Sequence, residues 1–399
     1  MKRSSKSLPV IVSPVIVNGT ACLRALGRRG AYCVAVSAEK DAPGFRSRFA
    51  REKVLLAAET LHAGGFTDWL LSRTDLYGGI VVPTDDTILA ELDAHRDALS
   101  PRFRLAIPSA PVCAVALDKS ALARVAAEAG IPIPKTASHA VELPPEAFED
   151  AAGVGFPAIV KPCFGADFGP AFGKKALVFD SPGPLRDAVA KCRARSIDVI
   201  IQELVPGHMA SYSAYVTRAG WIAGDFSSRR LGVYPPPFGT GFLEAAEFIG
   251  PVMEYGRRLI DCVGYSGALV NLDFAFDPRD GAWKLLDLNA RSWRQVSLAE
   301  AVGLNVFDFL LADYAGDGPP PPGAGPPEPP RVKYGARWLY LKDALRALRA
   351  SPKDAPSLRV IAKTLCGPLS CALFDAGDMR PFLADVAPLV LRRFKHHES

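Results

Sequence analysis

The chain has 399 residues, 49% of them hydrophobic and 22% charged, with 47 Lys and Arg against 42 Asp and Glu. The length predicts two or three domains, and the composition excludes a chain that is disordered throughout. A net charge of +5 is too small to indicate a nucleic-acid partner, and the lack of any apolar run of about 18 residues excludes a membrane-spanning helix. The eight cysteines form no CxxC pair, which indicates free thiols and a cytoplasmic protein.

The first 110 residues alternate short apolar runs with amphipathic stretches. We expect strands at 10–17, 31–37 and 79–83, and helices at 21–29 and 88–98. This alternation predicts a parallel sheet joined by crossover helices. Asn18, Gly19 and Thr20 are expected at a turn from strand to helix, where backbone amides can face an anion. A simple connection is an equal alternative there, because the full GxGxxG pattern is missing. Asp85 and Asp86 are placed to cap the next helix.

The middle of the chain combines short strands with a glycine-rich segment. A helix opened by Asp118 is expected at 121–129, and a buried strand at 156–160 leads directly into Lys161. The glycines of segment 163–173 are four residues apart, which favours a mobile loop over a helix. Further expected elements are strands at 176–180 and 199–205, a helix at 184–195, and a hairpin of strands 212–217 and 221–226.

A second predicted hairpin, with strands 269–277 and 282–288, carries the most informative side chains. With its turn at 278–281, Asp273 faces Asp287 and Asn271 faces Asn289 on one side of the sheet. Opposed carboxylates repel each other unless a cation lies between them, and hard oxygen ligands suit Mg²⁺. Arg291 continues the same face and could meet phosphate oxygens, whereas the alternative is a solvated face without a ligand. The opposite face is expected to be apolar, with Leu272, Phe274, Phe276, Leu286 and Leu288.

The C-terminal part follows two helices expected at 295–301 and 306–314. Eight of the fifteen residues from 316 to 330 are proline, which predicts a stiff linker or a surface excursion. Residues 331–399 return to a mixed apolar pattern, so we expect them to fold onto the main body.

Five short motifs, in this order and at these intervals, resemble the ATP-grasp superfamily over residues 10–315. They are Asp118-Lys119, Ile159-Val160-Lys161-Pro162 with the glycine-rich segment, Gln202-Glu203-Leu204-Val205-Pro206-Gly207, Asp273, and Asp287-Leu288-Asn289-Ala290-Arg291. Within the superfamily, the chain resembles predicted carboxylate–amine ligases near D-aspartate ligase. That resemblance is carried by Phe172-Gly173-Lys174-Lys175-Ala176, Arg229-Arg230-Leu231-Gly232-Val233-Tyr234-Pro235 and Gly239-Thr240-Gly241.

The resemblance implies an α/β chain with an ATP-grasp fold, in which two α+β subdomains clasp ATP. A Rossmann-like parallel-sheet domain precedes them in the chain. The implied divisions are a Rossmann-like domain at 1–112, a small subdomain with the glycine loop at 113–198, a large subdomain with the magnesium site at 199–315, a Pro-rich linker at 316–330 and a C-terminal accessory segment at 331–399.

The resemblance also implies roles for individual residues. Mg²⁺, or Mn²⁺ in its place, would be bound by Asp273, Asp287 and Asn289, and the transferred phosphoryl group by Arg291 with Arg230 or Arg229. ATP would be bound by Lys119, Lys161, Gly165, Gly169, Lys174, Glu203 and the Leu204 backbone. The sequence departs from the family at three points: Asp287 replaces a usual glutamate, the loop lacks serines, and His208 and Met209 stand where an acidic ribose ligand is common.

The activity that the resemblance implies is ATP-dependent ligation of a carboxylate to an amine. An acyl phosphate would be the intermediate, and ADP and phosphate would be released. The implied partners are small amino-acid-like substrates, without nucleic acid or a membrane span, and a homodimer is compatible with the sequence. The alternatives are a non-catalytic ATP-binding regulatory module and a bicarbonate-activating carboxylase or carbamoyl-phosphate-type relative.

Overall fold

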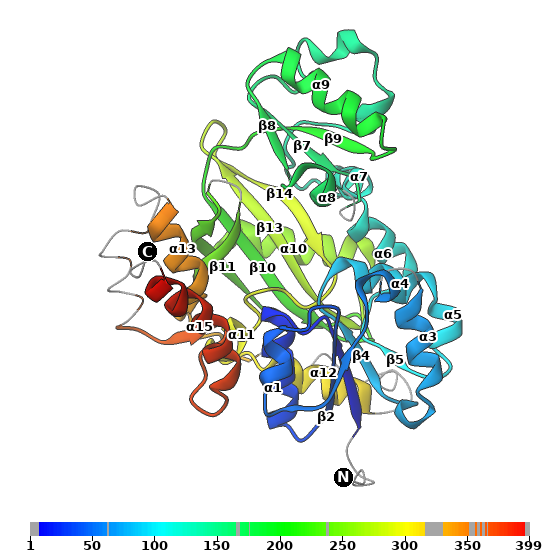
Figure 1. The fold of residues 1–399 in the computed structure, drawn as a ribbon. Coiled ribbons are helices and arrows are strands. Elements are labelled where there is room, and N and C mark those ends of the chain that lie inside the picture. The colour runs from blue at the N-terminus through cyan, green and yellow to red at the C-terminus, as the bar shows by residue number, and fades with distance from the viewer. Residues whose placement is uncertain are drawn as a thin grey trace.

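The computed structural model describes residues 8–61, 64–164, 168–174, 176–236, 239–315, 330–350 and 366–395, together with residues 356, 360 and 364. These residues form three β-sheets with helices around them (Figure 1). Among them, no helix is long and apolar enough to cross a membrane. The expected α/β architecture with a parallel N-terminal sheet is confirmed.

The N-terminal part of the chain forms a five-stranded parallel sheet, as its alternating pattern predicts. The strand order is β3 (Ala50–Leu55), β2 (Tyr32–Ser37), β1 (Pro9–Ser13), β4 (Ile80–Pro83) and β5 (Arg104–Leu105). The helical segments are α1 (Val17–Arg28), η1 (Pro43–Arg46), α2 (Ala58–Leu61), α3 (Gly65–Ser72), η2 (Thr74–Leu76), α4 (Asp86–Ala94) and α5 (Arg96–Leu99). Strand β1 is buried along its whole length because β2 and β4 flank it.

The strand predicted at 10–17 is shorter than expected, because it ends at Ser13 and α1 already begins at Val17. Asn18, Gly19 and Thr20 therefore lie in the first turn of the helix and not in the turn before it. The apolar run continues past the strand because Pro14 and Val15, in the connection to the helix, are buried as well. Gly19 is required by close packing, since a Cβ there would lie 2.2 Å from the Pro14 carbonyl oxygen.

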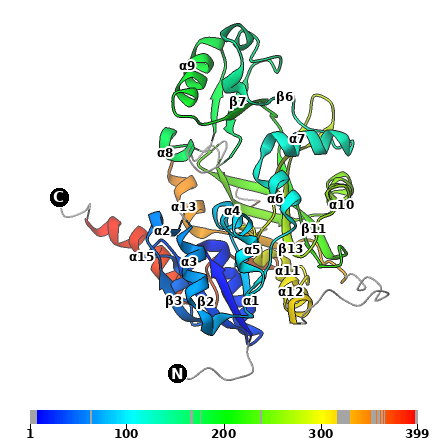
Figure 2. The ribbon, with the colours of Figure 1, turned by 90° about the vertical axis from the view of Figure 1, so that its right-hand side faces the viewer.

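The second sheet has four antiparallel strands and belongs to a separate unit of residues 136–203. Its order is β6 (Thr136–Ala137), β9 (Val199–Glu203), β7 (Ala158–Pro162) and β8 (Leu177–Phe179). The chain enters it through α6 (Ala110–Leu117) and α7 (Lys119–Glu128), and it contains η3 (Ala140–Glu142), η4 (Pro145–Phe148), α8 (Phe168–Phe172) and α9 (Pro182–Arg193). We call it the small unit. It has a hydrophobic core of its own and projects from the rest of the molecule (Figures 1 and 2).

Helix α8 lies inside the segment 163–173, where the sequence predicts a loop. Two aromatic residues explain the difference. Phe168 is only 1% exposed, and its ring centroid lies 4.7 Å from that of Phe172 one helical turn later. Burial of Phe168 against the core of the small unit therefore stabilises a short helix that includes Gly169. Gly165 lies outside the described residues.

The third sheet is the largest, with seven strands. Its order is β14 (Ala282–Asn289), β13 (Ala268–Asp277), β10 (Met209–Val216), β11 (Ile222–Tyr234), β12 (Thr240–Ala246), β15 (Arg337–Leu339) and β16 (Leu369–Cys371). Its helices are α10 (Gly250–Val263), α11 (Ser297–Ala301), α12 (Val306–Ala315), α13 (Leu341–Ala350) and α15 (Arg380–Lys395). Both predicted hairpins, β10–β11 and β13–β14, are confirmed.

The apolar face of the β13–β14 hairpin differs from the prediction by one residue. The register shifts by one residue after Asp273, so that Phe274 pairs with Leu285. Leu285 therefore joins Leu272, Phe274 and Leu288 in the buried cluster, in the place expected for Leu286. An extra residue of this kind displaces the alternation of side chains along one strand only.

The described part of the C-terminal segment extends the large sheet. Strand β15 pairs with β12 in antiparallel fashion, and β16 pairs with β15 in parallel. Trp338 of β15 is completely buried. The proline-rich residues 316–329 lie outside the described part of the chain, and the domain boundaries given above stay a prediction.

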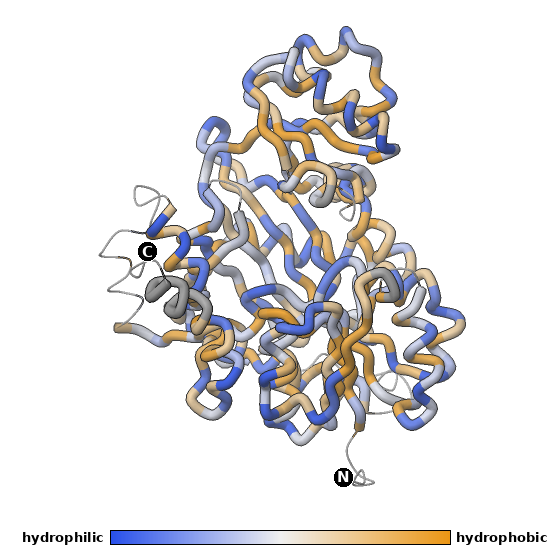
Figure 3. The backbone as a smooth tube through the Cα atoms, viewed as in Figure 1, coloured by the Kyte–Doolittle hydropathy of each residue, from blue (hydrophilic) through white to orange (hydrophobic). Residues whose placement is uncertain are grey.

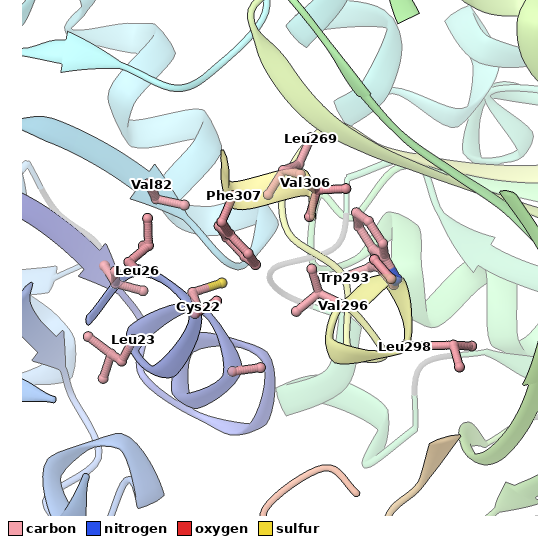
Figure 4. Packing of buried hydrophobic residues seen from close by; sticks show 14 of the residues in the cluster. Cys22, Leu23, Leu26, Val82, Leu269, Trp293, Val296, Leu298, Val306 and Phe307 are labelled. Carbon is pink, nitrogen blue, oxygen red and sulfur yellow. The ribbon is translucent and has the colours of Figure 1, made fainter. Parts of the chain in front are cut away.

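The parallel sheet and the large sheet share their hydrophobic cores. One buried cluster includes residues from both sheets together with α1, α11 and α12, and a second cluster joins both sheets on other faces. Figure 4 shows Cys22, Leu23 and Leu26 of α1 near Phe307 and Val296 from the chain that follows β14. Figure 3 shows hydrophobic residues along the central strands of the parallel sheet. These two sheets therefore form one body, and the small unit is attached to it.

Candidate functional site

The opposed carboxylates predicted from the sequence lie on neighbouring strands of the large sheet. Asp273 pairs with Asp287 and Asn271 pairs with Asn289, so the predicted register is confirmed at these positions. The Asn289 amide donates to Asn271 Oδ1 at 3.3 Å, and the Asn271 amide donates to Ser213 Oγ of β10 at 3.0 Å. Ser213 of the neighbouring strand β10 therefore orients the side-chain amides of Asn271 and Asn289.

Each carboxylate is paired with a cationic side chain from a different part of the chain. Lys119 Nζ lies 3.0 Å from Asp287 Oδ1, and Arg230 Nη2 lies 3.0 Å from Asp273 Oδ1. Ser211 of β10 donates its hydroxyl to the same Asp273 oxygen at 2.8 Å. The repulsion between the opposed carboxylates is thus offset by two protein cations.

These charges shift the pKa values of the groups at the site. Burial acts to raise the pKa of Asp287, but the positive charges of Lys119, Lys161 and Arg291 outweigh it, and the pKa lies below its usual value. Burial, together with the nearby Lys119 charge, lowers the pKa of Lys161 to about 8. Lys161 therefore holds its proton less firmly than an ordinary lysine. An anionic ligand beside it would stabilise its charged form.

One of the two lysines lies in the segment that leads into the small unit, and the other lies in a strand of that unit. Lys119 is the first residue of α7, whose N-cap Asp118 accepts hydrogen bonds from two backbone amides of the first turn. Lys161 is the last residue but one of β7, and its Nζ donates to Gln202 Oε1 of the adjacent β9 at 3.0 Å. The site therefore forms where the small unit meets the large sheet.

The side chain of Arg291, just after β14, forms an ion pair with helix α4, which follows strand β4 of the parallel sheet. Its Nε and Nη2 lie 2.8 and 3.0 Å from the two carboxylate oxygens of Asp86, the first residue of α4. Nη2 also donates to Asn289 Oδ1 at 2.8 Å. A planar guanidinium held in this two-pronged way has a fixed orientation.

A second contact links the N-terminal part of the chain to the segment that follows β14. The side chain of Asn18, in the first turn of α1, donates to the carbonyl oxygens of Thr84 at 2.6 Å and Ser292 at 3.2 Å. All three residues are buried. Asn18, expected at a turn whose backbone amides could face an anion, therefore lies beside the residue that follows Arg291 and bonds it through its side chain.

Arg230 is held between two acids. Besides Asp273, it faces Glu244 of β12, with 3.4 Å between Arg230 Nε and Glu244 Oε1. Glu244 is 2% exposed, and its other oxygen accepts a hydrogen bond from Ser228 at 3.0 Å. Burial raises the pKa of Glu244 even though Arg230 opposes the shift. A single glutamate in the apolar run Phe242–Ala246 is the sequence signal that could have identified this residue.

Arg229 points away from this group. Its Nη2 lies 2.6 Å from Glu247 Oε1. Neighbouring residues of a strand face opposite sides of the sheet, so the two adjacent arginines cannot both reach Asp273. The structure therefore brings Arg230, and not Arg229, to the carboxylate pair.

Glu203 and Leu204 lie at the end of β9. Both oxygens of Glu203 already accept hydrogen bonds: Oε1 from Lys284 Nζ and the Lys135 amide, each at 2.9 Å, and Oε2 from Arg279 at 2.9 Å. The Leu204 amide donates to the Pro157 carbonyl oxygen at 3.2 Å. The Glu203 carboxylate is thus engaged by protein groups.

Of the expected loop residues, Gly169 lies within α8, and its carbonyl oxygen accepts from the Gly173 amide at 2.8 Å. Lys174 is exposed just beyond this helix. Neither residue contacts the carboxylate pair among the described residues.

The donor set around Asp273 and Asp287 fits a hard divalent cation. Among the described residues, Oδ2 of each carboxylate accepts no hydrogen bond, while Oδ1 of each is occupied by a protein donor. The two unoccupied oxygens and the Asn289 amide oxygen are of the kind that Mg²⁺ prefers.

The sequence and the fold were compared with those of known proteins. No protein-family model matches the sequence. A segment of 121 residues, 29% of this chain, is 26% identical to part of the D-aspartate ligase of Enterococcus faecium, and it spans 28% of that ligase. The chain is thus similar to little more than a quarter of that relative.

Three solved structures cover more of the chain. A Rhizobium etli pyruvate carboxylase matches 83% of it with a TM-score of 0.64 and 16% identity, although the match spans only 30% of the carboxylase. A biotin carboxylase domain from Hydrogenobacter thermophilus, solved with MgADP and bicarbonate, matches 82% of this chain and 73% of its own, with a TM-score of 0.64 and 14% identity. An L-amino acid ligase from Bacillus licheniformis matches 79% and 75%, with a TM-score of 0.59 and 15% identity. The chain has the ATP-grasp fold of these enzymes.

Proposed function

We propose that this ATP-grasp protein is a cytoplasmic ATP-dependent ligase that joins a small carboxylate to an amine and releases ADP and phosphate. Mg²⁺, or Mn²⁺ in its place, is the proposed metal. The observation that carries the proposal is the facing pair Asp273 and Asp287, each held by a protein cation, on the large sheet close to Lys161 of the small unit.

The surrounding residues supply what phosphoryl transfer to a carboxylate needs. Lys119 at the start of α7 and Lys161 of the small unit lie near the carboxylate pair and would bind the ATP phosphates. Asp273, Asp287 and Asn289 would hold the metal, which would neutralise charge on the transferring phosphoryl group. Arg230 and Arg291 would bind the organic carboxylate and the phosphate on its acyl carbon, since both are fixed guanidinium groups beside the metal ligands.

The proposed reaction needs no nucleophilic residue. A substrate carboxylate oxygen attacks the γ-phosphorus of ATP, ADP leaves, and an acyl phosphate forms. The amine nitrogen then attacks the acyl carbon, phosphate leaves with the C–O electron pair, and the nitrogen loses a proton to give the amide. The contribution of the protein is to bind, orient and exclude water from the acyl phosphate.

Two alternatives make different demands. A non-catalytic ATP-binding module would not need Arg230 and Arg291 beside the metal ligands. A bicarbonate-activating enzyme is compatible with the fold, because carboxylases are among the structural neighbours. We favour the ligase because a segment of the sequence is similar to part of a D-aspartate ligase.

The test is ADP release from Mg-ATP with a panel of carboxylates, with and without amines. We expect ADP and phosphate in equal amounts only when both substrates are present, and an acyl hydroxamate when hydroxylamine replaces the amine. Asp287→Asn is the matched control and should abolish both products. Pyrophosphate and AMP as products would contradict the proposal, and turnover with bicarbonate alone would favour the carboxylase.

A further inference from the structure

A second group of potential metal ligands lies in the small unit, away from Asp273 and Asp287. His139 precedes η3, Cys163 directly follows β7, and Asp198 directly precedes β9. One ligand atom from each side chain lies within 4.8 Å of the other two. Three segments that are distant in sequence thus bring a nitrogen, a sulfur and an oxygen donor to one point.

The local structure holds these donors in place. The Val199 amide donates to Asp198 Oδ1 at 2.8 Å, while Asp198 Oδ2 lies 2.6 Å from His139 Nδ1. The Cys163 amide donates to the Asp198 carbonyl oxygen at 3.0 Å. His139 has a left-handed backbone with a φ of 50°, a conformation that is uncommon for residues other than glycine. Backbone strain of this kind persists where the surroundings impose it.

The electrostatic surroundings favour a cation at this point. Burial raises the pKa of the Cys163 thiol to about 12, and Asp198 and Asp118 add to that effect, although Ser120 opposes it. The hydrogen bond to Asp198 raises the pKa of His139, and Glu142 and Asp118 act in the same direction. The negative charges of Asp198 and Asp118 thus act on both the thiol and the imidazole.

We propose that His139, Cys163 and Asp198 bind a zinc ion, with solvent as the fourth ligand. Imidazole, thiolate and carboxylate are all ligands of Zn²⁺, whereas Mg²⁺ avoids sulfur, so this donor set differs in kind from the one at Asp273 and Asp287. Zinc–ligand distances of about 2.0–2.3 Å would require the donors to close by about 1 Å. Cys163 is 1% exposed while the His139 side chain is 52% exposed, so the ion would enter from the histidine side.

Zinc at this position would hold together β7 and α7, the elements that carry Lys161 and Lys119. The Lys119 amide approaches the Cys163 carbonyl oxygen at 3.5 Å, and Ser120 Oγ lies 3.7 Å from Cys163 Sγ. Lys161 precedes Cys163 by two residues. A bound ion would therefore fix the end of β7 relative to the start of α7, and we infer a structural role in the small unit.

The test uses the full chain with saturating Mg²⁺, so that Asp273 and Asp287 do not compete for the added ion. Zn²⁺ and Co²⁺ are titrated against a chromophoric chelator, and thiolate-to-cobalt charge transfer is recorded in the ultraviolet. We expect one tight equivalent with a thiolate band. Cys163→Ser should remove the band and weaken binding by about 100-fold or more, and His139→Asn and Asp198→Asn should weaken it as well.

The matched control is Cys192→Ser, which alters another fully buried cysteine of the small unit, in α9. It should keep the band and the affinity, and circular dichroism verifies that each variant is folded. Equal binding by the wild type and Cys163→Ser, or a cobalt spectrum without a thiolate band, would overturn the proposal. His139 and Asp198 would then form an ion pair only.

Discussion

At the scale of single residues, each of the two opposed carboxylates of the site is held by its own cationic side chain. Lys119 is paired with Asp287, and Arg230 lies between Asp273 and Glu244. Glu244 is buried, and among the described residues its hydrogen bonds are to Ser228 and Arg230, so we expect its role in the proposed ligase to be the orientation of Arg230.

We predict that Glu244→Gln lowers kcat by about 10- to 100-fold while the KM for ATP changes little, because the neutral amide holds the Arg230 guanidinium less firmly. Steady-state kinetics with the cognate substrates measures both values. Glu247→Gln is the matched control, since Glu247 pairs with the outward-facing Arg229. An equal loss in the two variants would show that Glu244 has no specific role.

Lys161 leads to a prediction about pH. Its folded pKa of about 8 lies below the 10.5 of a free lysine, so the protein without ligand loses this charge as the pH rises through 8. Binding of Mg-ATP should therefore be independent of pH below that point and weaken above it, by at most about tenfold per pH unit. Calorimetric titration on both sides of the transition checks this. In Lys161→Arg the decline should vanish, because arginine stays charged; a decline of the same size in that variant would assign it to another group.

At the scale of elements, the large sheet depends on a strand from beyond the proline-rich segment. Residues 337–339 pair with the edge of β12, and Trp338 is completely buried between the sheet and its helices. The segment after residue 330 is therefore continuous with the sheet that carries Asp273 and Asp287.

We predict that cutting the chain within 316–329, at an inserted protease site, leaves the two fragments associated through β12 and β15. They should elute together in size-exclusion chromatography and keep the activity of the uncut protein. Trp338→Asp in the cut protein should release the C-terminal fragment, because a buried unpaired charge costs several kcal/mol, about 3–5. Separate elution of the unmutated fragments would refute the proposed continuity.

At the scale of the whole molecule, the candidate site needs all three sheets. The carboxylates proposed to bind the metal come from the large sheet, and Lys161 comes from the small unit. Lys119 lies at the start of α7, and Asp86 and Asn18 lie in helices α4 and α1, which accompany the parallel sheet. ATP contacts are the same for any ligated substrate, so substrate selection should depend on the parallel sheet.

We predict that Asp86→Asn raises the KM for an organic substrate about tenfold, with a much smaller change in the KM for ATP, because Arg291 loses its charged partner. Asp85→Asn is the control, since asparagine still caps α4 through Ile88. A change confined to the KM for ATP would place substrate selection elsewhere.

Some of this was determined by the sequence alone. Short-range rules were enough for β1, β2 and β4 of the parallel sheet, whereas β3 and β5 were not predicted. They were also enough for the capped helices α4 and α7 and for the facing of Asp273 with Asp287, because turn chemistry and a two-residue side-chain period act between neighbours in the chain. The limits of such rules appear at α8, where burial of Phe168 overrides the helix-breaking glycines, and at Leu285, where one extra residue shifts the buried face.

Only the tertiary structure decided which charges meet. The pairs Arg291–Asp86, Arg230–Glu244 and Lys119–Asp287 join residues that are 205, 14 and 168 positions apart. Nothing in the local pattern distinguishes Arg230 from Arg229, or the engaged Glu203 from a glutamate with free oxygens. The physical reason is that an ion pair depends on where whole elements pack, and that packing is set by burial of apolar surface across the three sheets and not by the charged residues themselves.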